Sequence, residues 1–261
     1  MYKHHEDALN AITVIKRVDA DEVRVIDLAD IHYGALACLK TKLINLVQRI
    51  LAIPNLFVII GGDSTESANT VSRSSLYDEA CHGSDQILQL REILKPLADA
   101  KRILFVRSGN HGMKRAKATN GIPPEQMLAA LLDVPFFRGG GIVILNARKN
   151  QYIIATWHTG KAPARFAWLQ TNVNFFEHKH DVGQRTVLFA TPNRLTKQWL
   201  VRPTINVQTS SFLGWAGYAM DEGYAPLPNH VPVAVFSGRK EDWDVYVLDD
   251  IRLLERSLGM P

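Results

Sequence analysis

The first part of the chain alternates short apolar runs with longer stretches in which apolar residues recur every three or four positions. The β-branched runs Ile12 to Val18 and Val23 to Leu28 predict two strands. Leucine, valine and isoleucine at helical spacing between Cys38 and Leu51 predict a helix, which ends before Pro54. Leu56 to Ile60 then predicts a buried strand. Such alternation is typical of an α/β fold.

The alternation continues with a second helix around Ile87 to Leu97, a third strand at Arg102 to Val106 and a short helix from Pro123 to Leu132. Residues 64–82 are rich in serine, threonine and asparagine, which predicts a long loop of the kind that is usually functional or mobile. Residues 107–122 are expected to form a basic loop.

The second half of the chain consists mostly of predicted strands. They are Ile142 to Asn146, Tyr152 to Trp157, Thr186 to Ala190, Trp199 to Val201, Ile205 to Val207, Val231 to Phe236 and Asp244 to Leu248. Between them, aromatic and aliphatic residues spaced three and four apart predict a helix over 163–178. No linker rich in proline, glycine or serine divides the chain, so residues 1–261 are interpreted as one domain built on a mixed sheet or on two packed sheets.

Composition narrows the class of protein. The chain has 261 residues, 46% hydrophobic and 21% charged, which excludes a disordered tail, a collagen-like repeat and a small disulfide scaffold. No stretch approaches the ~20 apolar residues of a membrane helix, and the first residues do not form a secretory signal. Only Cys38 and Cys81 are cysteines. We therefore expect a cytoplasmic protein with no membrane partner.

Four polar clusters each follow a predicted strand. They are Asp30-Ile31-His32, Gly61-Gly62-Asp63, Gly109-Asn110-His111 and the single residue His158. In open α/β sheets, ligands bind beyond the carboxyl ends of the strands. Taken singly, each cluster is typical of a helix cap, a turn or a core histidine. Their joint order instead indicates one site.

These residue types suit a metal centre. Carboxylate, imidazole and amide oxygen ligands together favour divalent manganese, iron or zinc, of which we expect manganese. One bridging aspartate would hold two ions about 3.5–4 Å apart, and such pairs activate a hydroxide that attacks phosphate esters. The glycines before Asp63 and Asn110 let the backbone turn sharply and approach the ions.

The order Asp-x-His, Gly-Asp, Gly-Asn-His and His resembles the signature of the calcineurin-like metallophosphoesterase superfamily. The resemblance runs from Asp27 to His158 and more weakly to Phe212. It implies a four-layer α-β-β-α sandwich of two mixed sheets with flanking helices. The layout from Gly61 to Pro135 is similar to that of phage and mobile-element members.

The resemblance also implies a role for each metal ligand. Asp30 and His32 would bind the first ion, and Asp63 would bridge the two ions. Asn110 and His158 would bind the second ion. Two divalent ions are therefore the expected cofactors.

The last motif of the family, Gly-His-x-His, is altered in this chain. Its positional match is Ala190-Thr191-Pro192-Asn193, which follows a predicted strand but lacks both histidines. Asn193 could still offer an amide oxygen and is kept as an expected ligand. The alternative, His178-Lys179-His180, has the right internal spacing but lies at the end of a predicted helix. Both alternatives remain open.

A basic cluster surrounds the Gly-Asn-His motif. The resemblance places His111 beside the leaving-group oxygen, where a protonated imidazole acts as general acid. Arg107 precedes it, and Lys114, Arg115 and Lys117 follow it. Lys114, Arg115 and Lys117 are expected to rim the metal site and, together with Arg107, to bind further phosphates of a polyanionic substrate. The whole chain is only mildly basic, with a formal charge of +4.

Three functions fit these motifs. The favoured one is a metal-dependent phosphodiesterase or nuclease acting on DNA or RNA, because of the basic rim and the long loop. A phosphomonoesterase acting on a small ester or a phosphoprotein fits the core motifs equally well. A catalytically weakened relative that serves as a binding or structural module is suggested by the missing histidines. The motifs leave the oligomeric state open.

Overall fold

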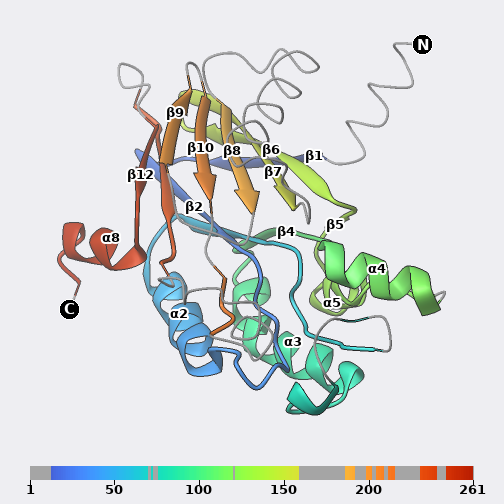
Figure 1. The fold of residues 1–261 in the computed structure, drawn as a ribbon. Helices are drawn as coiled ribbons and strands as arrows, with labels where there is room; N and C mark the ends of the chain where they lie inside the picture. Colours follow the sequence, from blue (N-terminus) through green and yellow to red (C-terminus); the bar gives the residue numbers. More distant parts are fainter. Residues whose placement is uncertain are drawn as a thin grey trace, which may run out of the picture.

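The computed structural model describes residues 13–69, 72, 76–119, 121–158, 186–191, 198–201, 204–208, 211–214, 230–239 and 245–260. These residues form two mixed sheets with helices packed on one of them (Figure 1). No helix among them is long and apolar enough to cross a membrane.

The first sheet contains the strand that ends in His158. Its order is β1 (Thr13–Val18), β6 (Gly140–Ala147), β7 (Asn150–His158), β8 (Thr186–Thr191), β10 (Thr204–Gln208) and β9 (Gln198–Val201). Strands β6 and β7 form an antiparallel hairpin, whereas β7 and β8 run parallel. The parallel register pairs His158 with Thr191 at the end of both strands.

The second sheet carries the other three motifs. Its order is β12 (Val245–Leu248), β11 (Val233–Ser237), β2 (Glu22–Leu28), β3 (Leu56–Ile60), β4 (Ile103–Arg107) and β5 (Phe136–Phe137). Strands β2, β3, β4 and β5 are parallel to one another. Their carboxyl ends therefore meet at one edge, where the loops that contain Asp30, Asp63 and Asn110 begin.

The parallel strands of the second sheet are buried on both faces. Successive residues of β2 and β3 alternate between two apolar cores, as the period of a strand requires. Val25 and Ile59 face the core between the two sheets. Ile26 and Val58 face a second core, under the helices. Each fully buried side chain of this size contributes roughly 1.5–3 kcal/mol to stability.

Helices cover the outer face of the second sheet. They are α2 (Lys40–Ala52), α3 (Gly83–Asp99), α5 (Pro124–Leu132) and the short α8 (Ile251–Ser257). Figure 1 shows α2, α3 and α5 side by side beneath this sheet, with α4 (Asn110–Thr119) next to α5. In α2, the buried positions Leu43, Leu46, Val47 and Ile50 form one stripe at helical spacing.

Two mixed sheets with flanking helices confirm the predicted fold class. The prediction of a basic loop at residues 107–122 is wrong, because most of this segment forms helix α4. Residues in α4 such as Met113 and Ala116 favour a helix, and the high charge of the segment obscured that pattern. Strand β5 and helix α8 were not predicted. The helix predicted at 163–178 lies outside the described residues.

Candidate metal centre

Polar side chains from both sheets converge where β2, β3, β4 and β7 end. Asp30, Asp63 and His158 each offer a ligand atom, and these atoms lie within 4.8 Å of one another. All three side chains are buried. Buried carboxylates are costly unless they are paired or bind a cation. The structure therefore brings together three of the residues that the sequence predicted as metal ligands.

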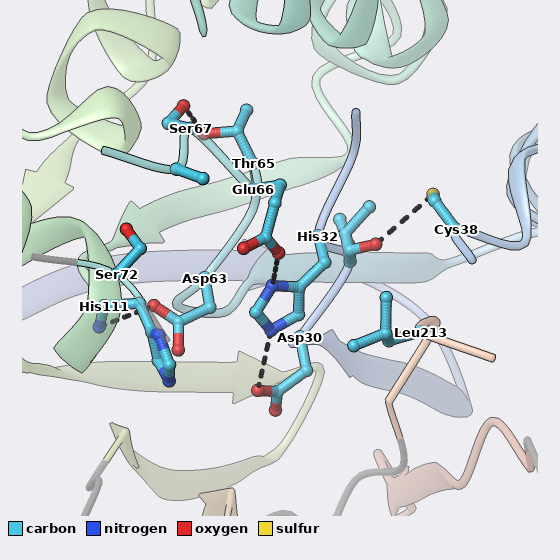
Figure 2. Close-up of polar contacts among 12 residues, drawn as sticks. Asp30, His32, Cys38, Asp63, Thr65, Glu66, Ser67, Ser72, His111 and Leu213 are labelled. Atoms are coloured by element: carbon cyan, nitrogen blue, oxygen red, sulfur yellow. Dashed lines mark hydrogen bonds and ion pairs between the residues drawn. The ribbon is translucent and has the colours of Figure 1, made fainter. Parts of the chain in front are cut away.

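Asp63 lies at the centre of this group. Its Oδ2 is 3.0 Å from Nε2 of His158. Its Oδ1 accepts a hydrogen bond of 3.0 Å from the backbone N–H of His111 (Figure 2). The first turn of α4 thus directs an N–H group at the carboxylate. Burial alone would raise the pKa of Asp63, but the neighbouring imidazoles, His158 foremost, together outweigh burial and lower that pKa.

Asn110 completes one side of the group. Its Oδ1 lies 2.8 Å from Nε2 of His158, so that one ring nitrogen faces both an amide oxygen and the Asp63 carboxylate. Burial lowers the pKa of His158, but the charge and hydrogen bond of Asp63, together with the charge of Asp30, outweigh burial and raise that pKa. Imidazole nitrogen, carboxylate and amide oxygen in one place form a donor set that fits manganese, iron or zinc.

His32 lies on the other side, next to Asp30. Its Nδ1 is 2.7 Å from Oε2 of Glu66, and its Nε2 is 3.8 Å from Oδ1 of Asp30 (Figure 2). A histidine that donates one ring N–H to a carboxylate presents the other nitrogen to a metal ion. Burial lowers the pKa of His32, but its interactions with Asp30 and Glu66 together outweigh burial and raise the pKa to about 10. A bound cation would replace the proton on Nε2.

The backbone at the site is strained and tightly packed. Asp30, His32 and Asp63 have φ angles of 50°, 47° and 57°, in the left-handed region that side-chain-bearing residues seldom adopt. Such residues cost of order 1–3 kcal/mol each and cluster at functional sites. A Cβ on Gly109 would lie 2.0 Å from Oδ1 of Asp63, so only glycine fits there. The backbone at this glycine therefore approaches the Asp63 carboxylate closely.

His111, the expected general acid, lies beside these ligands. Its half-buried ring meets the ring of His32 edge-on, with 5.7 Å between the centroids. Burial lowers the pKa of His111 below its ordinary value, although the nearby charge of Asp63 acts in the opposite direction.

Glu66 was not among the predicted site residues. It lies in the loop after Asp63, where it accepts hydrogen bonds from His32 and, through Oε1, from Nη2 of Arg115 at 3.0 Å. It therefore links the first metal-ligand motif to helix α4. Its place three residues after Asp63 is the only sequence signal that could have indicated it.

Glu125 was missed as well. Its Oε1 accepts a hydrogen bond of 3.1 Å from the backbone N–H of Asp63, and burial raises its pKa to about 7. A Cβ on Gly112 would lie 2.5 Å from its Oε2. No sequence signal separates Glu125 from an ordinary acidic residue in the first turn of a helix.

The prediction that four basic side chains bind substrate phosphates is wrong for two of them. Arg107 is completely buried and pairs with Asp27 at 2.9 Å. Arg115 is also buried, where it pairs with Glu66. Both side chains end on carboxylates inside the protein and cannot line an exposed rim. Lys114 and Lys117 do extend from the exposed face of α4.

The altered last motif is described only in part. Thr191 ends β8 beside His158, as the positional match expected. Asn193, His178 and His180 lie outside the described residues. Metal binding by Asn193 therefore stays a prediction, and so does the alternative His178-Lys179-His180.

No protein-family model matches the sequence, and no curated protein matches it. Solved structures do match. A predicted phosphoesterase from Streptococcus pneumoniae has 10% identity and a TM-score of 0.42, over 88% of this chain and 91% of that one. An archaeal phosphodiesterase has 14% identity and a TM-score of 0.43, over 87% and 100%. Zinc-complexed Vps29 from Entamoeba histolytica has 10% identity and a TM-score of 0.41, over 87% and 99%.

Proposed function

We propose that this protein is a metal-dependent phosphoesterase that cleaves phosphodiester bonds, with nucleic acid as its substrate. The observation that carries the proposal is the convergence of Asp30, Asp63 and His158, with ligand atoms within 4.8 Å of one another at the edge where strands of both sheets end. Left-handed φ angles at Asp30 and Asp63 support it, because strained backbone of this kind clusters at functional sites.

Two divalent ions, manganese in the first instance, are the proposed cofactors. Asp30 and His32 would hold one ion, Asn110 and His158 the other, and Asp63 both. When bound, such ions lower the pKa of water and neutralise the charge on phosphate oxygens. The Nδ1–H of His32 is held by Glu66, which keeps Nε2 directed at the site.

His111 is the proposed proton donor. Its backbone N–H is fixed on Asp63, which places the side chain next to the carboxylate at the start of α4. The negative charge of a bound phosphate raises the pKa of the neighbouring imidazole. The ring then carries a proton that it can give to the leaving-group oxygen.

Helix α4 supports a nucleic-acid substrate. It begins with Asn110 and His111 at the site and exposes Lys114 and Lys117 within the next two turns. Lysines next to a scissile phosphate can contact the neighbouring phosphates of a strand, which a small monoester lacks.

Hydrolysis assays with added Mn²⁺ test the proposal. We expect bis-p-nitrophenyl phosphate and single-stranded DNA to be cleaved faster than p-nitrophenyl phosphate, with all activity lost in EDTA. Asp63→Asn should be inactive, whereas Asp99→Asn, which changes an exposed carboxylate on α3, should behave as wild type. Faster cleavage of the monoester would make the protein a phosphomonoesterase. A protein that hydrolyses none of the three substrates would contradict the proposed activity.

A further inference from the structure

Three buried polar side chains meet directly behind the candidate metal centre. Oδ2 of Asp27 accepts hydrogen bonds from Nη2 of Arg107 at 2.9 Å and from Oγ1 of Thr156 at 2.6 Å. Asp27 is 2% exposed, and the other two side chains are 0% exposed. We call these three residues the Asp27 cluster.

Each member precedes a proposed metal ligand on the same strand or in the loop that follows it. Asp27 lies on β2 ahead of Asp30, Arg107 ends β4 ahead of Asn110, and Thr156 lies on β7 two positions before His158. The hydrogen bond from Thr156 to Asp27 joins the two sheets, because β7 belongs to the first and β2 to the second. The cluster thus connects the strands that must hold their ligands in register.

The fourth ligand-bearing strand also contacts the cluster. A Cβ on Gly61, which directly follows β3, would lie 2.7 Å from Oδ1 of Asp27. The backbone that leads to Asp63 therefore packs against the Asp27 carboxylate. Asp27, on β2, in this way contacts residues from the other three strands that lead to the candidate metal centre.

Stability alone does not account for the cluster. A buried ion pair gains little over well-packed apolar side chains, because the desolvation of two charges offsets their attraction. The surrounding strand positions are apolar, so a methyl-bearing side chain would suit this core. What the polar groups add is direction, since hydrogen bonds fix angles and distances that dispersion contacts leave free.

We propose that the Asp27 cluster is a positioning device that sets the distance between His158, on the first sheet, and the ligands carried by the second sheet. It acts through backbone placement and touches no substrate. The inference rests on the proposed function, since it concerns the affinity of the same site for divalent metal.

Thr156→Val tests this inference with little disturbance, because valine keeps the shape of threonine and removes the hydroxyl. We expect about tenfold weaker Mn²⁺ binding, the lower end of the loss caused by removing outer support of a metal site. Thr156→Ser, which keeps the hydroxyl, should bind Mn²⁺ as wild type does. Mn²⁺ affinity is measured by calorimetric titration of the full chain, and melting temperature is measured in EDTA.

Tyr152→Phe is the matched control. Tyr152 lies on the same strand, is equally buried, and donates a hydrogen bond of 2.7 Å across the sheets to the carbonyl of Ser237, at the end of β7 far from His158. Both Thr156→Val and Tyr152→Phe should lower the melting temperature by a few degrees. Only Thr156→Val should weaken Mn²⁺ binding.

The outcomes separate the two claims. Mn²⁺ binding that is unchanged in Thr156→Val, or weakened equally in Tyr152→Phe, would overturn the positioning role and leave the proposed function standing. A wild-type protein that binds no Mn²⁺ in the titration would overturn the proposed function and this inference with it.

Discussion

At the residue scale, the side chains of the candidate site are held in place by contacts with buried neighbours. His111 has its backbone anchored on Asp63 and its ring half-buried beside His32. These contacts place an imidazole next to the proposed metal ligands. Loss of this ring should therefore affect proton transfer more than metal binding.

We expect His111→Ala to lower turnover by about 10²–10⁴, the usual contribution of a positioned proton donor. Mn²⁺ affinity should remain close to that of wild type. The loss should be greater for esters with poor leaving groups, because a good leaving group departs without a proton. Steady-state rates on a series of aryl diesters measure this, and an equal loss across the series would remove His111 from the acid role.

A second residue-scale prediction concerns Glu66. Glu66→Gln removes the negative charge of the carboxylate that accepts hydrogen bonds from His32 and Arg115. We expect Mn²⁺ binding to weaken by about 10–100-fold, because a metal-ligating histidine depends on the group that holds its other nitrogen. Glu92→Gln, which changes an exposed glutamate on α3, is the control for the titration. A Glu66→Gln protein with wild-type affinity would show that His32 needs no such support.

Residues of the site differ in how far the sequence could predict them. Asp30, Asp63 and His158 follow strands in a recognisable order, and the structure brings their ligand atoms together. Glu66 and Glu125 act only through contacts that the fold creates between distant segments. The sequence pattern around Arg107 shows a charge but not its burial, which depends on Asp27 across the sheet.

At the scale of elements, helix α4 begins at the candidate metal centre and extends to the protein surface. Its first turn holds Asp63 through the N–H of His111, and its buried Arg115 reaches back to Glu66. Its exposed Lys114 and Lys117 are the remaining members of the predicted basic rim. Most strands and the helices α2, α3 and α5 were predicted from their sequence patterns. Helix α4 was not, because it buries few apolar side chains and its charges are typical of a loop.

We expect Lys114→Ala combined with Lys117→Ala to weaken single-stranded DNA binding and to flatten its salt dependence. The log–log slope should fall by about 0.7 for each phosphate contact that is lost. Cleavage of a small diester should be unchanged, because that substrate has no neighbouring phosphates. Fluorescence anisotropy over a range of salt concentrations measures the slope. An unchanged slope with intact binding would contradict the nucleic-acid substrate.

At the scale of the whole molecule, the two sheets are joined by an apolar core and by the polar Asp27 cluster within it. The order of strands in each sheet could not be predicted from local patterns, because neighbours such as β2 and β11 are distant in sequence. The resemblance to a known family predicted the two-sheet architecture. Local periodicity predicted most of the strands and helices that form it.

We expect Arg107→Met to lower the free energy of unfolding by about 3–5 kcal/mol, because it leaves the carboxylate of Asp27 charged and buried without its partner. Arg148→Met, which breaks exposed pairs with Asp19 and Asp21, should change stability little. Urea denaturation measures both variants. Equal effects would mean that the Asp27–Arg107 pair is not the buried link that the structure shows.

The central claim is that Asp63 lies between two divalent cations, and crystals soaked in Mn²⁺ test it most directly. An anomalous difference map at the manganese edge should show two peaks next to the Asp63 carboxylate. One peak should adjoin Asp30 and His32, and the other should adjoin Asn110 and His158. A map with no peak at Asp63, from crystals in which Mn²⁺ has free access to the site, would contradict the account.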